Sequence, residues 1–142
     1  MQFALLDSSV YISALRRGDP AILAARRLEA DSLLWLSSVV LAELYAGVRD
    51  PDRHVIERLE RDFAQTNRIL VPNLLDWTHT GKMLFRLAAK YHYEKIGQGR
   101  LVNDALIAVS AGRMGVTVIT ANEGDFRRLA EFRPFKWQIA SV

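Results

Sequence analysis

Cysteine is absent from the sequence, and no apolar run is long enough to cross a membrane. The absence of cysteine excludes disulfide bonds and thiolate metal sites. A membrane-spanning helix needs about 20 consecutive apolar residues. The first residues reach a carboxylate at Asp7 without a basic leader, which argues against a secretory signal. We therefore expect a cytoplasmic protein that does not enter a membrane.

Lysine is also scarce, so arginine carries most of the positive charge. The sequence contains 15 Arg and 4 Lys, and its formal net charge is +3 at pH 7. Arginine is preferred where a planar, bidentate contact with phosphate is needed. The composition is compatible with a nucleic-acid partner, although a basic surface that is only solvated would have the same composition.

The composition is otherwise that of one globular domain. The 142 residues are 50% hydrophobic and 25% charged, which is enough apolar material for a folded core. No repeat, linker or low-complexity tract divides the chain. We expect a single domain over residues 1–142.

Short apolar runs alternate with longer amphipathic segments. The apolar runs predict strands at residues 3–6, 33–36, 68–72, 116–120 and 135–139. The amphipathic segments predict helices at residues 20–30, 40–47, 55–63, 74–93 and 101–114, with a short helix after Asn122. Strands separated by helices imply βα crossovers, so we expect an α/β fold with a mostly parallel sheet covered on both faces.

Two acidic segments directly follow predicted strands. Asp7 ends the first strand, and residues 120–125 follow the strand at 116–120. The carboxyl ends of parallel strands share one edge of the sheet, and ligands bind there in open α/β folds. We therefore expect Asp7 and Asp125 at the same rim.

Two further carboxylates interrupt apolar helix faces. Glu43 lies one turn from Val40 and from Gly47, and Asp104 lies one turn from Leu101 and from Ala108. A charge on an apolar face is unfavourable unless something compensates it. Grouped carboxylates repel one another, and a divalent cation would remove that repulsion.

Oxygen ligands alone, with no cysteine and no histidine beside the acids, favour Mg²⁺ or Mn²⁺ over Zn²⁺. Such an ion activates water and stabilises charge on phosphate, which is the chemistry of phosphodiester hydrolysis.

Structural alternatives exist for each acid. Asp7 could cap the segment that begins at Ser8, and Glu43 or Asp104 could pair with an arginine in the core. Asp125 could form a capping-box-like pair with Asn122.

Other conspicuous residues have simpler interpretations. Asp19 and Asp50 each precede a proline, so we interpret both as helix caps. Trp35 and Trp77 are expected in the core rather than as platforms for stacking bases.

Four motifs together resemble the PIN-domain family, and within it the VapC-type toxins of bacterial toxin–antitoxin pairs. They are LDSSVYI at residues 6–12, SSVVLAELYAGV at 37–48, NDALIA at 103–108 and TANEGDF at 120–126. Each motif is short, but all four occur in family order across the whole chain. Some family members carry the last acid where this chain has Asn122.

The resemblance implies a three-layer α/β/α sandwich and a Mg²⁺- or Mn²⁺-dependent endoribonuclease. It also implies an RNA substrate, a cognate antitoxin and a homodimer. The implied catalytic and metal-binding residues are Asp7, Glu43, Asp104 and Asp125. The residues implied to orient these acids are Ser9, Thr120 and Asn122.

Two rival functions follow from the same residues. The first is a module on this fold that binds RNA or a protein partner without catalysis; metal-dependent cleavage of RNA would separate it from a nuclease. The second is a phosphohydrolase that uses Asp7 as a covalent nucleophile. That chemistry needs a second acid near Asp7 and a lysine to neutralise phosphate, whereas position 9 is Ser.

Overall fold

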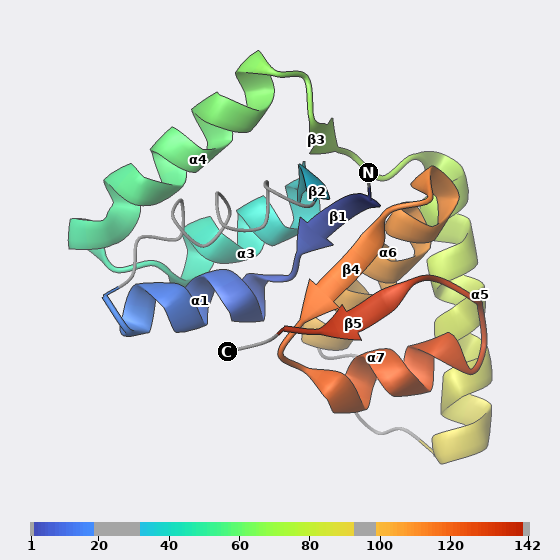
Figure 1. The fold of residues 1–142 in the computed structure, drawn as a ribbon. Helices are drawn as coiled ribbons and strands as arrows, with labels where there is room; N and C mark the ends of the chain where they lie inside the picture. The colour runs from blue at the N-terminus through green and yellow to red at the C-terminus, as the bar shows by residue number, and fades with distance from the viewer. Residues whose placement is uncertain (1, 19–31, 93–98, 141–142) are drawn as a thin grey trace.

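A computed structural model describes residues 2–18, 32–92 and 99–140 of the chain (Figure 1). Five strands form one sheet, in which every pairing is parallel. The strands are β1 (Gln2–Leu6), β2 (Ser32–Ser37), β3 (Ile69–Leu70), β4 (Thr117–Thr120) and β5 (Trp137–Ile139). Their order across the sheet is β3-β2-β1-β4-β5, so the first strand lies at the centre.

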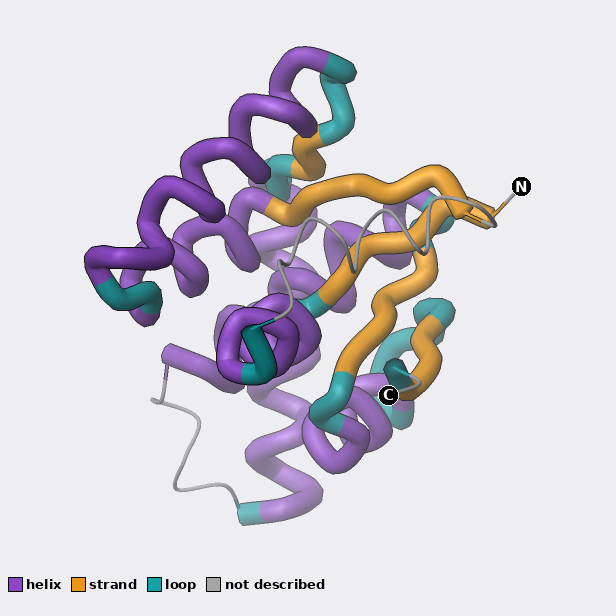
Figure 2. Tube along the Cα trace, turned by 60° about the vertical axis from the view of Figure 1, so that its left-hand side comes forward, coloured by secondary structure: helices purple, strands orange, loops and turns teal. Residues whose placement is uncertain are grey.

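Helices connect the strands and cover the sheet. They are α1 (Ser8–Arg16), α3 (Ser38–Gly47), α4 (Arg53–Gln65), α5 (Leu74–Tyr91), α6 (Gly99–Met114) and α7 (Glu123–Ala130), with a short 3-10 helix, η1 (Asp50–Asp52). Figure 1 shows α1, α3 and α4 to the left and α5, α6 and α7 to the right. Figure 2 shows the strands side by side, with helices to their left and below them. The expected α/β/α fold with a parallel sheet is confirmed.

The two central strands are apolar because the sheet is covered on both faces. Leu5 and Leu6 of β1 are at most 1% exposed, and Val118 and Ile119 of β4 are at most 3% exposed. Burying each such side chain contributes about 1.5–3 kcal/mol to folding. This core fixes the places where β1 and β4 end.

The strand order reverses between β1 and β4. From β1 the chain proceeds outward to β2 and β3, and then it crosses back to β4 and β5 on the other side. The backbone N–H of Asp7 donates to the carbonyl of Ile119 at 2.8 Å, so the ends of β1 and β4 stay adjacent. A crevice forms at such a reversal, and it is the usual ligand site of an open parallel sheet.

Several details differ from the sequence-based expectations. Helix α1 was not predicted, although its buried Tyr11 and Ala14 are spaced as on one helix face. The predicted strand at 68–72 is reduced to two paired residues in β3. The helix expected at 20–30 and its cap Asp19 lie outside the described residues.

Two interpretations of single residues were wrong. Asp50 is not a cap, because Arg49 occupies the cap position and Asp50 is the first residue of η1. Trp77 is not in the core, because it is 54% exposed on the outer face of α5. By contrast, Trp35 packs against the core as expected, and Ser37 caps α3 by accepting from two backbone N–H groups.

None of the helices within the described residues is long and apolar enough to span a membrane.

An ion pair between a buried aspartate and an exposed arginine joins α5 to α6. The side chain of Asp76 is 2% exposed and accepts from Nε of Arg113 at 3.0 Å. Asp76 also completes a capping box, because its carboxylate accepts from the backbone N–H of Asn73 while the Asn73 side chain accepts from the N–H of Asp76. The same carboxylate therefore starts one helix and anchors another.

Replacing Asp76 by Ala should lower the free energy of unfolding by about 2 kcal/mol. The variant loses a helix cap and a charged hydrogen bond, each of which contributes about 1 kcal/mol or more. Urea denaturation would measure the loss. The matched control is Glu123→Ala, which removes an exposed pair with Arg127 on α7 and should cost about 0.5 kcal/mol at most. Equal losses in the two variants would contradict this role for Asp76.

Candidate active site

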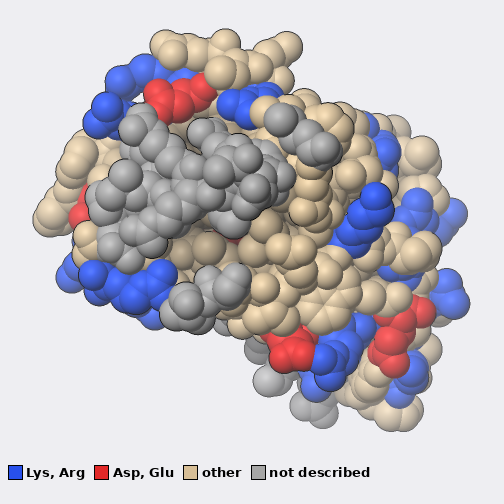
Figure 3. Space-filling model, viewed as in Figure 1, with Lys and Arg blue, Asp and Glu red and all other residues tan. Residues whose placement is uncertain are grey.

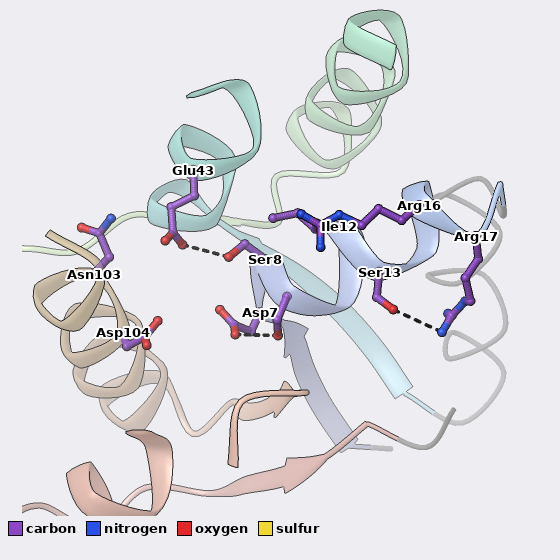
Figure 4. Close-up of a pocket in the computed structure, with 10 residues that line it drawn as sticks. Asp7, Ser8, Ile12, Ser13, Arg16, Arg17, Glu43, Asn103 and Asp104 are labelled. Carbon is purple, nitrogen blue, oxygen red and sulfur yellow. Dashed lines mark hydrogen bonds between the residues drawn. The ribbon is translucent and has the colours of Figure 1, made fainter. Parts of the chain in front are cut away.

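A cavity of about 720 Å³ opens at the carboxyl end of β1 (Figure 4). Asp7 lines it from the end of the strand, Glu43 from α3 and Asp104 from α6. These three acids are separated by 36 to 97 residues in the chain, yet they face one hollow. The structure thus brings together three of the four predicted acids.

Two hydroxyl groups orient the carboxylate of Asp7. Its Oδ2 accepts from Oγ of Ser9 and from Oγ1 of Thr120, both at 2.9 Å. Each hydroxyl in turn accepts from a backbone N–H: Ser9 from that of Ala121 at 3.1 Å, and Thr120 from that of Asn122 at 2.9 Å. Because a hydroxyl has a single proton to donate, these backbone bonds direct both protons to Asp7.

The other oxygen of Asp7 lacks such support. Asp7 is 2% exposed, and its Oδ1 is buried without a hydrogen-bond partner among the residues that the structure describes. Leaving a buried carboxylate oxygen unsatisfied costs more than about 1–3 kcal/mol. Asp7 occupies the N-cap position of α1 but makes no side-chain capping bond, so the capping alternative is wrong.

Glu43 and Asp104 reach the cavity from two helices. Oε1 of Glu43 accepts from Oγ of Ser8 at 3.2 Å, which ties α3 to the first turn of α1. Asp104 is 3% exposed and lies where α6 enters a run of fully buried residues. Its Oδ2 accepts from Nδ2 of Asn122 at 3.4 Å.

Asp125 is connected to this group through Asn122. The Asn122 amide donates to Oδ2 of Asp125 at 3.0 Å as well as to Asp104. Asn122 makes no side-chain capping bond on α7, so the capping-box alternative is wrong. Asp125 is not among the residues shown to line the cavity, and its Oδ1 lies 3.9 Å from Nη1 of Arg128. Asp125 therefore lies at the rim, beside the cavity.

The donor set suits a hard divalent cation. It consists of carboxylate oxygens, and the unsatisfied Oδ1 of Asp7 is an acceptor that a cation would neutralise. In the described part of the chain, no three acidic or histidine side chains lie close enough together to hold an ion directly. Mg²⁺ usually keeps several waters and needs one or two carboxylates, so the arrangement fits an ion bound partly through water.

Sequence analysis did not identify the residues at the other end of the cavity. Ser13, Arg16 and Arg17 of α1 line it together with the acids. These residues were missed because helix α1 was not predicted. Only a helix over residues 8–16 places the arginines along the same cavity as Asp7. The weak signal for that helix was the spacing of Tyr11 and Ala14.

Comparisons with known proteins agree with this fold. The crystal structure of VapBC2 from Rickettsia felis, bound to a DNA fragment from its promoter, matches with a TM-score of 0.69 and 22% identity, over 99% of this chain and 100% of that one. DNA-bound VapBC from Salmonella typhimurium matches with a TM-score of 0.68 and 23% identity, over 98% of each chain.

A third similar structure is VapBC-1 from nontypeable Haemophilus influenzae. It matches with a TM-score of 0.63 and 26% identity, over 97% of this chain and 98% of that one. No curated protein sequence matches the chain significantly. The sequence profile of the PIN domain family matches residues 4–132, and the chain therefore belongs to the PIN domain family.

Proposed function

We propose that the chain is an endoribonuclease that hydrolyses RNA phosphodiester bonds with the help of Mg²⁺ or Mn²⁺. The observation that carries the proposal is the buried, unsatisfied Oδ1 of Asp7 in a cavity that Glu43 and Asp104 also line. PIN domain proteins are generally nucleases, and they generally use divalent metal ions.

Asp7, Glu43 and Asp104 would bind the metal, directly or through water, and Asp125 would complete the group from the rim. The bound ion supplies an activated water and charge neutralisation at the phosphate. The chain's own contribution is positioning. Ser9 and Thr120 fix Asp7, and Asn122 links Asp104 to Asp125. Contacts of this kind commonly change metal affinity or activity by about 10–100-fold when they are removed.

We also propose that the chain acts in the cytoplasm as the toxin of a type II toxin–antitoxin pair, with RNA as substrate and a cognate antitoxin as inhibitor. The support is the family resemblance and the likeness to VapBC structures. A binding module without catalysis on the same fold is the alternative. The unsatisfied oxygen of Asp7 argues against it, because a module that only binds gains nothing from that cost.

A homodimer completes the proposal, with the outer face of α5 as its interface. Leu74, Trp77 and Phe85 are 82%, 54% and 76% exposed there, and contiguous exposed apolar patches mark interaction surfaces. A hollow of about 570 Å³ lies over Gly81, between Trp77 and Phe85. In a two-fold dimer both chains present the same surface, so that surface must be complementary to itself. Here a projecting aromatic ring and a hollow that can receive one lie on the same helix.

Purified protein should cleave single-stranded or looped RNA with Mg²⁺ or Mn²⁺, and EDTA should stop the cleavage. Asp7→Asn should lower the rate at least a hundredfold, because the isosteric amide cannot neutralise a cation. Gel analysis of end-labelled RNA would measure both effects. Undiminished cleavage in excess EDTA, or by the variant, would rule out the metal site.

Two controls make that experiment specific. Asp76→Asn changes an acid of equal burial outside the cavity and should leave the cleavage rate per folded molecule unchanged. In bacteria, expression of the wild-type chain should arrest growth, and Asp7→Asn should relieve the arrest. Equal toxicity of wild type and variant would separate the growth effect from the acids.

Asp7→Asn should leave the metal-free protein as stable as wild type, or slightly more stable. The amide oxygen can still accept from Ser9 and Thr120, and one repelling charge is gone. With Mg²⁺ at about 100 times its Kd, wild type should gain about 2.7 kcal/mol, and the variant much less. Thermal unfolding in EDTA and in Mg²⁺ would measure both. If the variant loses several kcal/mol in EDTA, Asp7 is a structural acid.

Phe85→Glu should convert a dimer into a stable monomer, because it places a charge in the apolar interface without touching the core. Sedimentation equilibrium should give twice the 16.1 kDa chain mass for wild type and the mass of one chain for the variant. Ile139→Glu, at another exposed apolar residue on β5, should remain dimeric. A monomeric wild type, or a dimeric Phe85→Glu protein, would rule out this interface.

A further inference from the structure

The cavity carries opposite charges at its two ends. Asp7, Glu43 and Asp104 line one end, and Arg16 and Arg17 line the other (Figure 4). Both arginines are exposed, so a ligand in solution can reach them. In Figure 3, basic side chains gather at the lower left of the molecule, where α1 ends.

Helix α1 sets the separation between the two ends. Ser8 begins the helix beside Asp7, and Arg16 ends it. At about 1.5 Å per residue, the Cα of Arg16 lies about 12 Å along the axis from that of Ser8. The arginines therefore lie beyond the acids, where a chain threaded through the cavity would continue.

The guanidinium of Arg17 is held in place within the cavity. Its Nη1 donates to Oγ of Ser13 at 3.2 Å, and Ser13 itself lines the cavity between the two ends. A guanidinium carries five N–H donors in a planar fork, so it can bind Ser13 and a phosphate oxygen together. A side chain that is already oriented loses less entropy when a ligand binds.

Arg16 lies where two hollows meet. It lines the acid cavity and also a second hollow of about 610 Å³, which Ile12 shares and which Leu15 and Leu44 line as well. A strand leaving the acid cavity past Arg16 would therefore enter a groove between α1 and α3 that Arg49 and Asp52 line together with apolar side chains.

We propose that Arg16 and Arg17 form a phosphate-binding subsite, which holds a backbone phosphate of the RNA next to the one that is cleaved. The inference rests on the proposed nuclease function and adds where the substrate runs. The acid end repels RNA when no metal is bound, so the attraction must come from cations nearby. Because phosphates are the same in every nucleotide, this contact gives affinity and register without sequence preference.

The test uses RNA binding by the Asp7→Asn protein, so that cleavage does not interfere. Removing two phosphate contacts with Arg16→Ala and Arg17→Ala should weaken binding of a short single-stranded RNA about tenfold at physiological salt. The slope of log affinity against log salt should fall by about 1.4, at about 0.7 per contact on a single strand. Fluorescence anisotropy at several salt concentrations measures both, on several RNA sequences.

Matched variants isolate the subsite. Arg58→Ala with Arg61→Ala removes the same charge from exposed positions on α4 that do not line the cavity, and it should change the slope little. Arg16→Lys with Arg17→Lys should keep the salt slope, because it keeps the charge, and should recover part of the affinity. Equal loss in the two alanine pairs would overturn the subsite, because general surface charge would then explain RNA binding.

The outcomes separate the subsite from the nuclease. If wild type cleaves RNA with Mg²⁺ and the Arg16→Ala, Arg17→Ala protein keeps its KM, the subsite is wrong and the nuclease stands. If wild type does not cleave RNA, but RNA affinity falls when the two arginines are replaced, the phosphate subsite is supported and the protein is an RNA-binding module rather than a nuclease. If the pair loses only its affinity for a protein inhibitor, with RNA binding intact, the basic end serves that partner and the proposal fails.

Discussion

The active-site geometry depends on the pairing of β1 with β4. That parallel pair places Asp7 beside Thr120, because the Asp7 N–H continues the ladder onto Ile119. Thr120 and Ser9 then donate both of their hydroxyl protons to one carboxylate oxygen, and the other oxygen is buried without a hydrogen-bond partner among the described residues. Shifting β4 by one residue would turn Thr120 to the opposite face of the sheet and would remove one of the two hydroxyl donors of Asp7.

The positions of Glu43 and Asp104 also depend on this sheet, through the helices that carry the two residues. Ser37, the last residue of β2, caps α3 and so sets the start of the helix that carries Glu43. Asp104 comes from α6, which is buried over residues 104–111, packs against α5, α7 and β4, and is anchored to α5 through Arg113 and Asp76. The cavity is therefore built from rigid elements rather than loops, and rigid support is what a metal-binding group needs.

The strands and the three central acids could be predicted from the sequence because each acid breaks an apolar pattern. Asp7 ends a buried strand, and Glu43 and Asp104 interrupt apolar helix faces. The resemblance implied that Asn122 orients an acid, but the sequence could not show that its amide joins Asp104, 18 residues away, to Asp125. Trp77 was misplaced for a related reason: helical spacing shows which residues share a face, but not whether that face meets the core or solvent.

The two ends of the cavity also bear on the order of binding. Carboxylates without a cation oppose an incoming phosphate, whereas a bound cation reverses the sign of the potential at that end. If the proposed metal and phosphate sites both operate, metal binding at Asp7 and phosphate binding at Arg16 and Arg17 would be coupled. The coupling would be reciprocal: if the ion raises the affinity for RNA by some factor, RNA raises the affinity for the ion by the same factor. The arginines supply attraction that does not depend on the metal. In the proposed mechanism the strand would therefore bind first and would raise the affinity of the acids for the ion.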